Sequence, residues 1–547
     1  MKKRLKTDVV IALCSSFTVC VFAPFEIYLS NKDFFFFNGF EMIPFSFLAF
    51  MALSLIILLL LITVMNIREK AHDAVLGVGF GLILAMYIQG NFLKNDYGTL
   101  DGNPIDWTLY IKEGIISVVL FVILEVIMTV LIIKLKDELF IKTIRTVAIY
   151  IFLIQLVAIV TLLIQNNGLN KESTYLATTE NEMVYGSEEN FVILMLDTYE
   201  STTLTRILEE DDGTYRGYLK DFVFYPDTTG MYRSTGFALP YLIGGVEYHN
   251  DCTYEEFLNK TYENSVLLND LRNDGWYIGV YNQNRIPDSD IALKADNCKK
   301  LNLTVSSHRR LAGYMYKLVG FRYMPQPLKR FFWFYADDIA SELRDTKEDV
   351  SIYGDNNFDF ANAYCDMQIG DMDRSFHLYE LFGAHPPYNI TEDFIYSDIG
   401  TDKISACKGL LVMLDGYMNK LRETGLYENT TVIVLGDHGK EILWNPVFLV
   451  KSSGADHELE INDTPFSYAE LQEIYEAISN GGGEESIKKI VYSHSTEDRR
   501  YLKFDNNTGI GKNDYFTADI YECRFSGRAD NKDSLITTDT VYEQHAK

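Results

Sequence analysis

The chain has 547 residues, 48% of them hydrophobic, and a formal net charge of −27. A chain of this length is expected to form more than one domain. Its 76 acidic residues outnumber its 49 basic ones, which argues against nucleic acid as a partner because phosphate backbones bind basic surfaces. Aromatic residues make up 14% of the chain and only 12 residues are proline, a composition unlike that of disordered proteins.

The apolar residues are concentrated in the first third of the chain. Five stretches are long and apolar enough to cross a bilayer: 9–28, 44–65, 74–93, 115–133 and 144–164. A signal peptide is the alternative for the first stretch, but this stretch lacks a small-residue cleavage site and four further spans follow it. We therefore predict a five-span transmembrane domain over residues 1–166 and a polar linker over 167–189.

The positions of Lys and Arg predict the orientation of these spans. Basic residues precede the first span, occupy the second connection and flank the fourth, whereas the first and third connections carry fewer. Because cytoplasmic connections are enriched in Lys and Arg, we expect the N-terminus inside and everything after the fifth span outside.

The rest of the chain alternates strand-like and helix-like segments. The strand candidates are 191–196, 276–281, 376–381, 431–435 and 447–450, and the helix candidates are 202–210, 404–423 and 468–478. Unbroken apolar strands that alternate with helices predict an α/β domain, with a mostly parallel sheet covered by helices on both faces. We assign this domain to residues 190–490, and the short aromatic strands of 491–547 to a small C-terminal β subdomain.

Polar side chains follow three of the predicted strands. Asp197 follows 191–196, His385 comes shortly after 376–381, and Asp437 and His438 come just after 431–435. Ligands of open α/β sheets bind beyond the carboxyl ends of the strands, so these side chains are expected to converge. Two carboxylates and an imidazole suit zinc or manganese. Taken singly, Asp197 has an alternative role as a helix cap, and the Asp-His-Gly run has one as a turn.

A candidate nucleophile lies in the segment 228–245. Two hydroxyl residues, Ser234 and Thr235, precede a glycine and an apolar helical run. A hydroxyl at a helix N-terminus lies where backbone N–H groups stabilise an anion. Capping of the helix is the alternative role for both residues.

Together these motifs resemble the sulfatase-like branch of the alkaline phosphatase superfamily. The five spans and single outer domain resemble the layout of lipoteichoic acid synthases and, more broadly, of phosphoethanolamine transferases. Three motifs are similar to the opening strand, the substrate-histidine motif and the metal-binding stretch of that family: FVILMLDTYES, GAHPPY and GLYENTTVIVLGDHGKE. The resemblance implies a multi-pass protein of the bacterial cell membrane with an extracytoplasmic catalytic domain.

The resemblance also implies roles for individual residues. It implies one divalent metal, zinc or manganese, held by four residues: Asp197, Thr235, Asp437 and His438. It favours Thr235 over Ser234 as the nucleophile, because these transferases place the threonine five residues before a proline, as Thr235 stands before Pro240.

Three further residues are expected at the substrate. By the same resemblance, His385 binds the phosphate or assists proton transfer. Arg233 and Lys440 flank the motifs and are candidates for phosphate contacts, with solvated surface charge as the alternative for both.

Some features depart from the family pattern. The first ligand is Asp197, where the transferases usually have Glu. Only His457 is within reach in sequence as a ligand for a second metal, so we expect one metal. No Cys-x-Pro-x-Arg or Ser-x-Pro-x-Arg motif is present at the nucleophile, which disfavours a formylglycine sulfatase.

The expected activity is transfer of a phosphoryl-linked headgroup through a covalent phosphothreonine. The donor would be a membrane phospholipid, and the acceptor a cell-envelope glycan or a lipid-linked molecule. Two alternatives stay open from the sequence: a metal-dependent hydrolase of phosphate or sulfate esters, and a catalytically inactive relative that binds the envelope.

Overall fold

The computed structural model describes residues 2–95, 97, 105–135, 138–283, 285–335, 338–505 and 518–543. The chain forms two compact units. The helical unit comprises Met1–Ser173 and Asn302–Lys347, and the α/β unit comprises Thr174–Leu301 and Glu348–Lys547. This division differs from the predicted domains, because the segment Asn302–Lys347 leaves the α/β unit and packs with the N-terminal helices.

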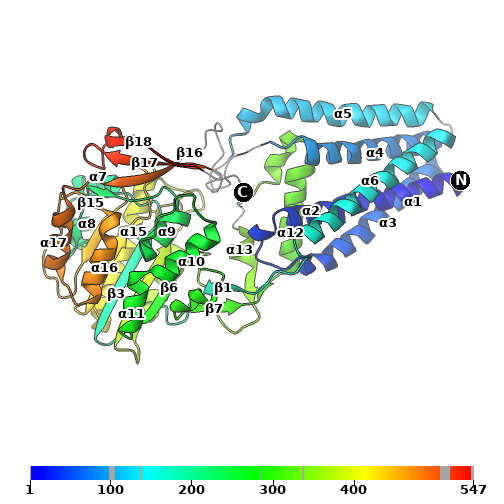
Figure 1. Ribbon diagram of the computed structural model, residues 1–547. Coiled ribbons are helices and arrows are strands. Elements are labelled where there is room, and N and C mark those ends of the chain that lie inside the picture. The colour runs from blue at the N-terminus through cyan, green and yellow to red at the C-terminus, as the bar shows by residue number, and fades with distance from the viewer. Residues whose placement is uncertain are drawn as a thin grey trace. The chain divides into compact units, whose positions relative to one another are not determined.

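The helical unit contains the five predicted spans as long apolar helices (Figure 1). Its helices are α1 (Lys2–Phe17), α2 (Ala23–Ser30), α3 (Ile43–Ile67), α4 (Glu69–Phe92), α5 (Ile111–Lys134) and α6 (Glu138–Gln165), with short turns η1 (Thr18–Phe22), η2 (Lys32–Phe34), η3 (Gly39–Met42) and η4 (Trp107–Tyr110). The first span runs through α1, η1 and α2. Many of the large apolar side chains of α3, α5 and α6 are exposed, as expected of helices that face lipid.

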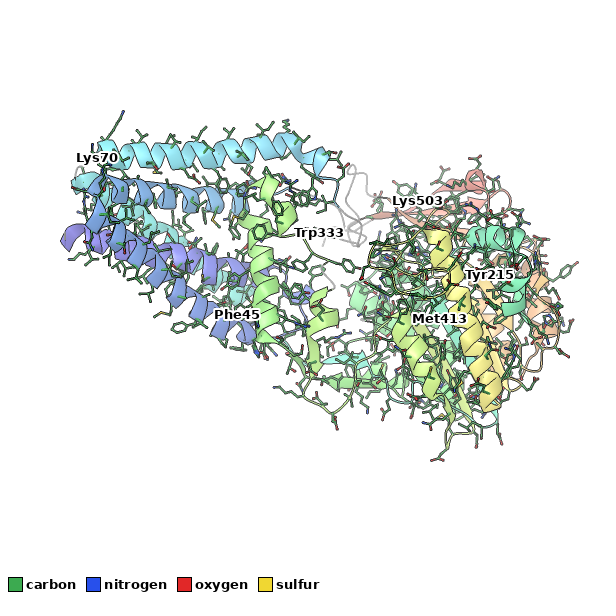
Figure 2. All side chains as sticks on the ribbon, turned by 180° about the vertical axis from the view of Figure 1, so that it is seen from behind. Phe45, Lys70, Tyr215, Trp333, Met413 and Lys503 are labelled. Atoms are coloured by element: carbon green, nitrogen blue, oxygen red, sulfur yellow. The ribbon has the colours of Figure 1, made fainter. Side chains whose placement is uncertain are left out.

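The segment Asn302–Lys347 lies against one end of these helices. It contains β8 (Leu303–Val305), α12 (His308–Tyr323), η6 (Gln326–Phe331), α13 (Asp338–Leu343) and β9 (Arg344–Thr346). Leu311, Met315 and Val319 recur every four residues and form a buried stripe on α12. Figure 2 shows Phe45 of α3 beside this helix, where its ring contacts Tyr316, and Lys70 at the opposite end of the bundle.

The α/β unit is built on a seven-stranded sheet. Its strand order is β14 (Glu460–Ile461), β4 (Val223–Phe224), β13 (Phe448–Lys451), β12 (Thr430–Leu435), β3 (Glu189–Leu196), β11 (Arg374–Leu381) and β6 (Tyr277–Tyr281). The four strands β12, β3, β11 and β6 are parallel, while β13 is antiparallel to both of its neighbours. Nearly every residue of β3, β11 and β12 is buried, which explains the apolar runs of β3 and β12. Strand β11 also buries the polar residues His377 and Glu380.

Helices cover both faces of this sheet. They are α7 (Ser201–Glu209), α8 (Thr214–Tyr218), α9 (Thr235–Gly244), α10 (Tyr254–Asn264), α11 (Val266–Asn273), α14 (Asn357–Ala363), α15 (Lys403–Thr424), α16 (Leu471–Ser479) and α17 (Glu484–His494), with short turns η5 (Asp290–Lys294), η7 (Tyr364–Asp366), η8 (Tyr468–Glu470) and η10 (Lys532–Ser534). Helices α9, α10, α11 and α16 lie in front of the sheet in Figure 1. Figure 2 shows the other face, with Met413 on α15 and Tyr215 on α8. The predicted α/β fold with a mostly parallel sheet is confirmed.

Most of the predicted linker, from Thr174 onward, is part of the α/β unit, whereas residues 167–173 belong to the helical unit. The linker strand β1 (Thr174–Ala177) pairs with β7 (Cys298–Leu301), and β2 (Val184–Tyr185) pairs with β10 (Gln368–Ile369). Tyr185 is fully buried, and its hydroxyl is hydrogen-bonded to those of Tyr379 and Tyr417 at 2.8 and 2.9 Å. The Thr, Asn and Glu residues between these short strands gave the segment its linker-like composition.

The C-terminal strands form a sheet of their own, as predicted. Strand β17 (Asp519–Phe525) pairs antiparallel with both β16 (Arg500–Asp505) and β18 (Leu535–Tyr542). A further short pair, β5 (Thr228–Thr229) with β15 (Phe466–Ser467), lies beneath the loop that leads to α9.

Candidate metal centre and nucleophile

Three predicted ligands converge at the carboxyl ends of two neighbouring strands. Strands β3 and β12 pair in parallel with Met195 opposite Leu435, so the residues that follow them emerge at the same edge of the sheet. His438 Nε2 lies 3.8 Å from Asp197 Oδ1 and 3.5 Å from Asp437 Oδ2. One ligand atom from each of the three residues lies within 4.8 Å of the other two.

These residues fit a divalent metal ion. Asp197 Oδ1 and Asp437 Oδ2 are buried and accept no hydrogen bond from any described residue. The Nδ1 of His438 lies 2.8 Å from the carbonyl oxygen of Gly439 and must donate to it, since a carbonyl only accepts. That tautomer leaves a lone pair on Nε2 for a metal. Two carboxylate oxygens and an imidazole nitrogen are a ligand set for zinc or manganese.

The electrostatics of the site favour a bound cation. Burial and the nearby Asp437 carboxylate raise the pKa of Asp197 well above its ordinary value. Two carboxylates this close repel each other, and a divalent cation between them removes that repulsion. The other oxygen of Asp437, Oδ1, is held by the N–H groups of Thr198 at 3.1 Å and His438 at 2.7 Å.

Thr235 faces this cluster from the first residue of α9. Its hydroxyl donates to Asp197 Oδ2 at 3.3 Å, and the residue is 7% exposed. Ser234 occupies the N-cap position but makes no capping hydrogen bond through its side chain. The structure therefore brings Thr235, rather than Ser234, into hydrogen-bond contact with the carboxylate of Asp197.

His385 lies in the loop that follows β11, and this loop packs directly on Asp197. The N–H of Ala384 donates to the carbonyl of Asp197 at 2.8 Å, and Gly383 passes so close that a Cβ there would collide with the Asp197 backbone. His385 Nδ1 donates to the Pro386 carbonyl at 2.6 Å, which leaves a lone pair on Nε2. Burial lowers the pKa of His385, and the charge of Lys440 lowers it further.

The remaining predicted residues have different surroundings. Arg233 lies two residues before Thr235, in the loop that leads to α9. Lys440 lies two residues after His438, in the loop that follows β12, and its charge lowers the pKa of His385. His457 is paired with Glu484, with 2.8 Å between Nε2 and Oε2, and is not one of the three clustered ligands.

Sequence reasoning missed the residue that holds the loop after His438. Glu200 Oε2 accepts backbone N–H groups from Lys440, Glu441 and Ile442 at 3.0, 3.0 and 3.2 Å. Its other oxygen pairs with Lys403. Glu200 is 1% exposed, so its carboxylate is a buried anchor for this loop. Its position just before α7 is the one local signal, and that signal alone indicates only a cap.

A partly buried arginine near Asp197, Arg285, was missed as well. Arg285 Nη1 donates to Glu380 Oε1 at 2.9 Å, and Glu380 is the penultimate residue of β11. The Nε of Arg285 is buried and has no hydrogen-bond partner in the described structure. The Arg285 charge also lowers the pKa of Asp197, against the larger effect of burial. Arg285 lies in a loop without a recognisable motif, so its sequence gave no signal.

Comparison with known proteins yields similar solved structures only. No family model matches the chain, and no curated protein matches it. The crystal structure of Ps i-CgsB with k-i-k-neocarrahexaose is 11% identical, covers 62% of this chain and 84% of its own, and has a TM-score of 0.41. The C-terminal periplasmic domain of EptC from Escherichia coli is 10% identical, covers 68% of this chain and 97% of its own, and has a TM-score of 0.33.

Two further matches have the same low identity. The phosphonate monoester hydrolase of Silicibacter pomeroyi is 11% identical, covers 64% of this chain and 88% of its own, and has a TM-score of 0.35. An alkaline phosphatase superfamily protein from Vibrio parahaemolyticus is 10% identical, covers 67% and 85%, and has a TM-score of 0.36. At these values the likeness carries no argument about activity. The structures that the chain matches include members of the superfamily that its motifs resemble.

Proposed function

We propose that the α/β unit is a metal-dependent phosphotransferase with Thr235 as its nucleophile. The observation that carries this proposal is the hydrogen bond from the Thr235 hydroxyl to Asp197, within the cluster formed with Asp437 and His438. A hydroxyl at the first residue of a helix, beside two buried carboxylate oxygens that have no hydrogen-bond partner among the described residues, is suited to attack on an electrophile. An inactive protein would have no need to keep this arrangement buried and unsatisfied.

Asp197, Asp437, His438 and Thr235 would hold the metal. Bound there, it would lower the pKa of the Thr235 hydroxyl and neutralise charge on the phosphoryl group. The Thr235 oxygen would attack phosphorus and break the bond to the lipid glycerol, leaving a phosphothreonine diester. His385, neutral with a free Nε2, would carry the Thr235 proton to the departing glycerol oxygen. The acceptor hydroxyl would then displace Thr235, and its proton would return to Thr235 through His385.

The charges around the cluster support an anionic substrate. Arg285 keeps a buried Nε without a hydrogen-bond partner among the described residues, next to the ligand Asp197. Lys440 lies in the loop after His438, and Arg233 in the loop before Thr235. We assign Arg285 and His385 to the phosphoryl group, with Arg233 and Lys440 as further contacts.

We further propose that the helical unit anchors the enzyme in a bacterial cell membrane. Its five helices are long and apolar enough to cross a bilayer. With the α/β unit outside, a phospholipid of the outer leaflet would be the donor and an envelope glycan or lipid-linked molecule the acceptor. A membrane anchor keeps the enzyme where its donor is concentrated.

Intact-protein mass spectrometry tests the covalent step. The purified full-length protein is supplied with Mn²⁺ or Zn²⁺ and a mixture of phospholipids, without an acceptor. We expect an adduct on Thr235 whose mass names the transferred group. Thr235→Ala should form none, while Ser234→Ala, the matched control, should form it normally.

Other outcomes would redirect the assignment. Release of headgroup without acceptor or adduct would indicate a hydrolase, in which water takes the place of the acceptor. An adduct that persists in Thr235→Ala would refute the assigned nucleophile. A folded protein that binds neither Mn²⁺ nor Zn²⁺ would favour an inactive, envelope-binding role.

A further inference from the structure

A groove lies in the helical unit, where the outer surface of α5 meets η6. Its volume is about 460 Å³. One wall is apolar and consists of Ile111, Ile115, Val118 and Val119 from the first turns of α5. Trp107 and Arg330 provide aromatic and basic groups in its lining. Among its described lining residues, the groove therefore combines an apolar surface with a single cationic side chain, Arg330.

The groove is a built part of the helical unit. The N–H of Gln326 in η6 donates to Ser117 Oγ of α5 at 3.0 Å. The side chain of Gln326 is 3% exposed and accepts hydrogen bonds from Asn95 and from Tyr97. Gly114 of α5 lies next to Pro327, and a Cβ added to Gly114 would lie 3.6 Å from Pro327 Cγ, at ordinary van der Waals distance. These contacts fix η6 on α5, beside the exposed face of that helix.

The apolar wall is exposed and belongs to a membrane-length helix. Ile111 and Ile115 are both 62% exposed. They lie in the first turns of the span Trp107–Lys134, where a tryptophan and a tyrosine, Trp107 and Tyr110, also line the groove. Aromatic residues of this kind are typical of the boundary between lipid and water. An acyl chain is the occupant that matches such a wall.

The segment that carries Arg330 is basic, in contrast to the protein as a whole. Between His308 and Tyr335 there are six Lys and Arg residues and no Asp or Glu, in a chain of net charge −27. In the described structure Arg330 has no acidic partner, and its guanidinium lies over the ring of Phe331 at 4.9 Å. A guanidinium with no acidic partner among the described residues, at the edge of an apolar groove, is suited to a phosphate.

We infer that this groove binds a phospholipid with a net negative headgroup. Its phosphate would be held by Arg330, and one acyl chain would lie along Ile111, Ile115 and Val119. The inference rests on the proposed membrane placement of the helical unit but not on the chemistry of Thr235. It is also separate from the metal cluster, which belongs to the α/β unit.

Native mass spectrometry in detergent micelles tests the inference on the full-length protein. The Thr235→Ala protein is used without added metal, so that no lipid is consumed. It is titrated with phosphatidylglycerol or with phosphatidylcholine of the same acyl chains. We expect a bound lipid with a clear preference for phosphatidylglycerol, and no competition from soluble glycerol phosphate, which lacks the acyl chain.

Two variants probe the two ends of the groove, each with a matched control. Arg330→Gln should weaken phosphatidylglycerol binding about ten-fold, because it removes a charge-assisted contact. Arg309→Gln removes the same charge from α12, away from the groove, and should have little effect. Ile115→Trp should fill the groove and abolish binding of both lipids. Val122→Trp places the same bulk two turns further along the exposed face of α5 and should bind normally.

Several results would overturn the inference. Equal binding of the two lipids would show that the headgroup is not selected. Equal losses in Arg330→Gln and Arg309→Gln would indicate diffuse attraction to the basic segment rather than a site. Normal binding by Ile115→Trp, with its thermal unfolding unchanged, would exclude this groove as the location.

Discussion

Replacing the buried Glu200 with glutamine should weaken metal binding even though Glu200 touches no metal ligand side chain. Its carboxylate accepts three backbone N–H groups from the loop that follows His438, and it pairs with Lys403, whose side chain is 10% exposed. Hydrogen bonds to a charged group contribute about 1.5–3 kcal/mol each, and a neutral amide keeps only part of that. Breaking a buried ion pair adds a cost of about 3–5 kcal/mol.

Part of this loss in stability should appear as reduced metal affinity, because the loop begins at His438, a proposed metal ligand. Supporting residues of this kind typically alter metal affinity by about 10–100-fold. The assay is isothermal titration of Mn²⁺ or Zn²⁺ into the metal-free full-length protein. Glu441→Gln is the matched control, since it removes the same charge from the same loop at an exposed position. Lys403→Met combined with Glu200→Gln should bind metal better than Glu200→Gln alone, because the unpaired lysine charge is then removed.

The pH dependence of this anchor has a defined sign. Burial opposes ionisation of Glu200, but the Lys403 charge and the loop N–H groups outweigh it, so its pKa is lowered. A lowered pKa means that the stabilisation is fully present above the ordinary value of 4.5 and is lost as the pH falls through the folded value. Unchanged metal affinity in Glu200→Gln, or an equal loss in Glu441→Gln, would refute the anchoring role.

Three further perturbations test other parts of the α/β unit. Thr235→Ala should reduce turnover of a labelled phospholipid by about 10³-fold or more, whereas Thr235→Ser should retain measurable turnover; comparable activity in both would exclude the hydroxyl at position 235 as the nucleophile. Gly383→Ala should destabilise the protein by about 1–3 kcal/mol and weaken metal binding, because the φ of Gly383 is 59° and the new Cβ would meet the Asp197 backbone. Calorimetric unfolding measures the stability and metal titration the affinity. A variant that is unaffected in both would contradict the close packing. Burial lowers the pKa of His377 to about 3 from 6.5, so acid should destabilise the native state by about 2 kcal/mol between pH 7 and pH 5. Since His377→Phe cannot be protonated, its unfolding should vary less with pH over that range, and an identical pH profile would show that His377 does not titrate in this way.

The sequence predicted those features that depend on local pattern. Each of the five spans is a predominantly apolar stretch, and the central strands β3 and β12 carry apolar runs because helices cover both faces of the sheet. Asp197, Asp437 and His438 could be grouped because the ends of parallel strands share one edge. Their grouping needed only the order of the strands along the chain and the assumption of a parallel sheet.

Other features depend on partners far away in sequence. Glu200 and Lys403 form their ion pair across 203 positions, and nothing next to either residue indicates the other. The stripe of Leu311, Met315 and Val319 has the same spacing whether a helix covers a sheet or packs against other helices. The pattern therefore shows that α12 has a buried face but not which unit buries it. Short strands such as β1 and β2 are also hard to recognise in the sequence, because a few apolar residues among polar ones fit a linker equally well.

The segment Asn302–Lys347 interrupts the sequence of the α/β unit and determines how this unit can be produced alone. A soluble fragment that begins at Thr174 would carry α12 without the helices that cover it, and its apolar stripe would promote aggregation. The two ends of the segment Asn302–Lys347 lie side by side, since the N–H of Lys347 donates to the carbonyl of Asn302 and β8 pairs with β9. A short Gly/Ser bridge from Leu301 to Glu348 would therefore close the gap at small entropic cost. The α/β unit is discontinuous in sequence yet separable by a single splice, in the manner of a host domain that carries an inserted module.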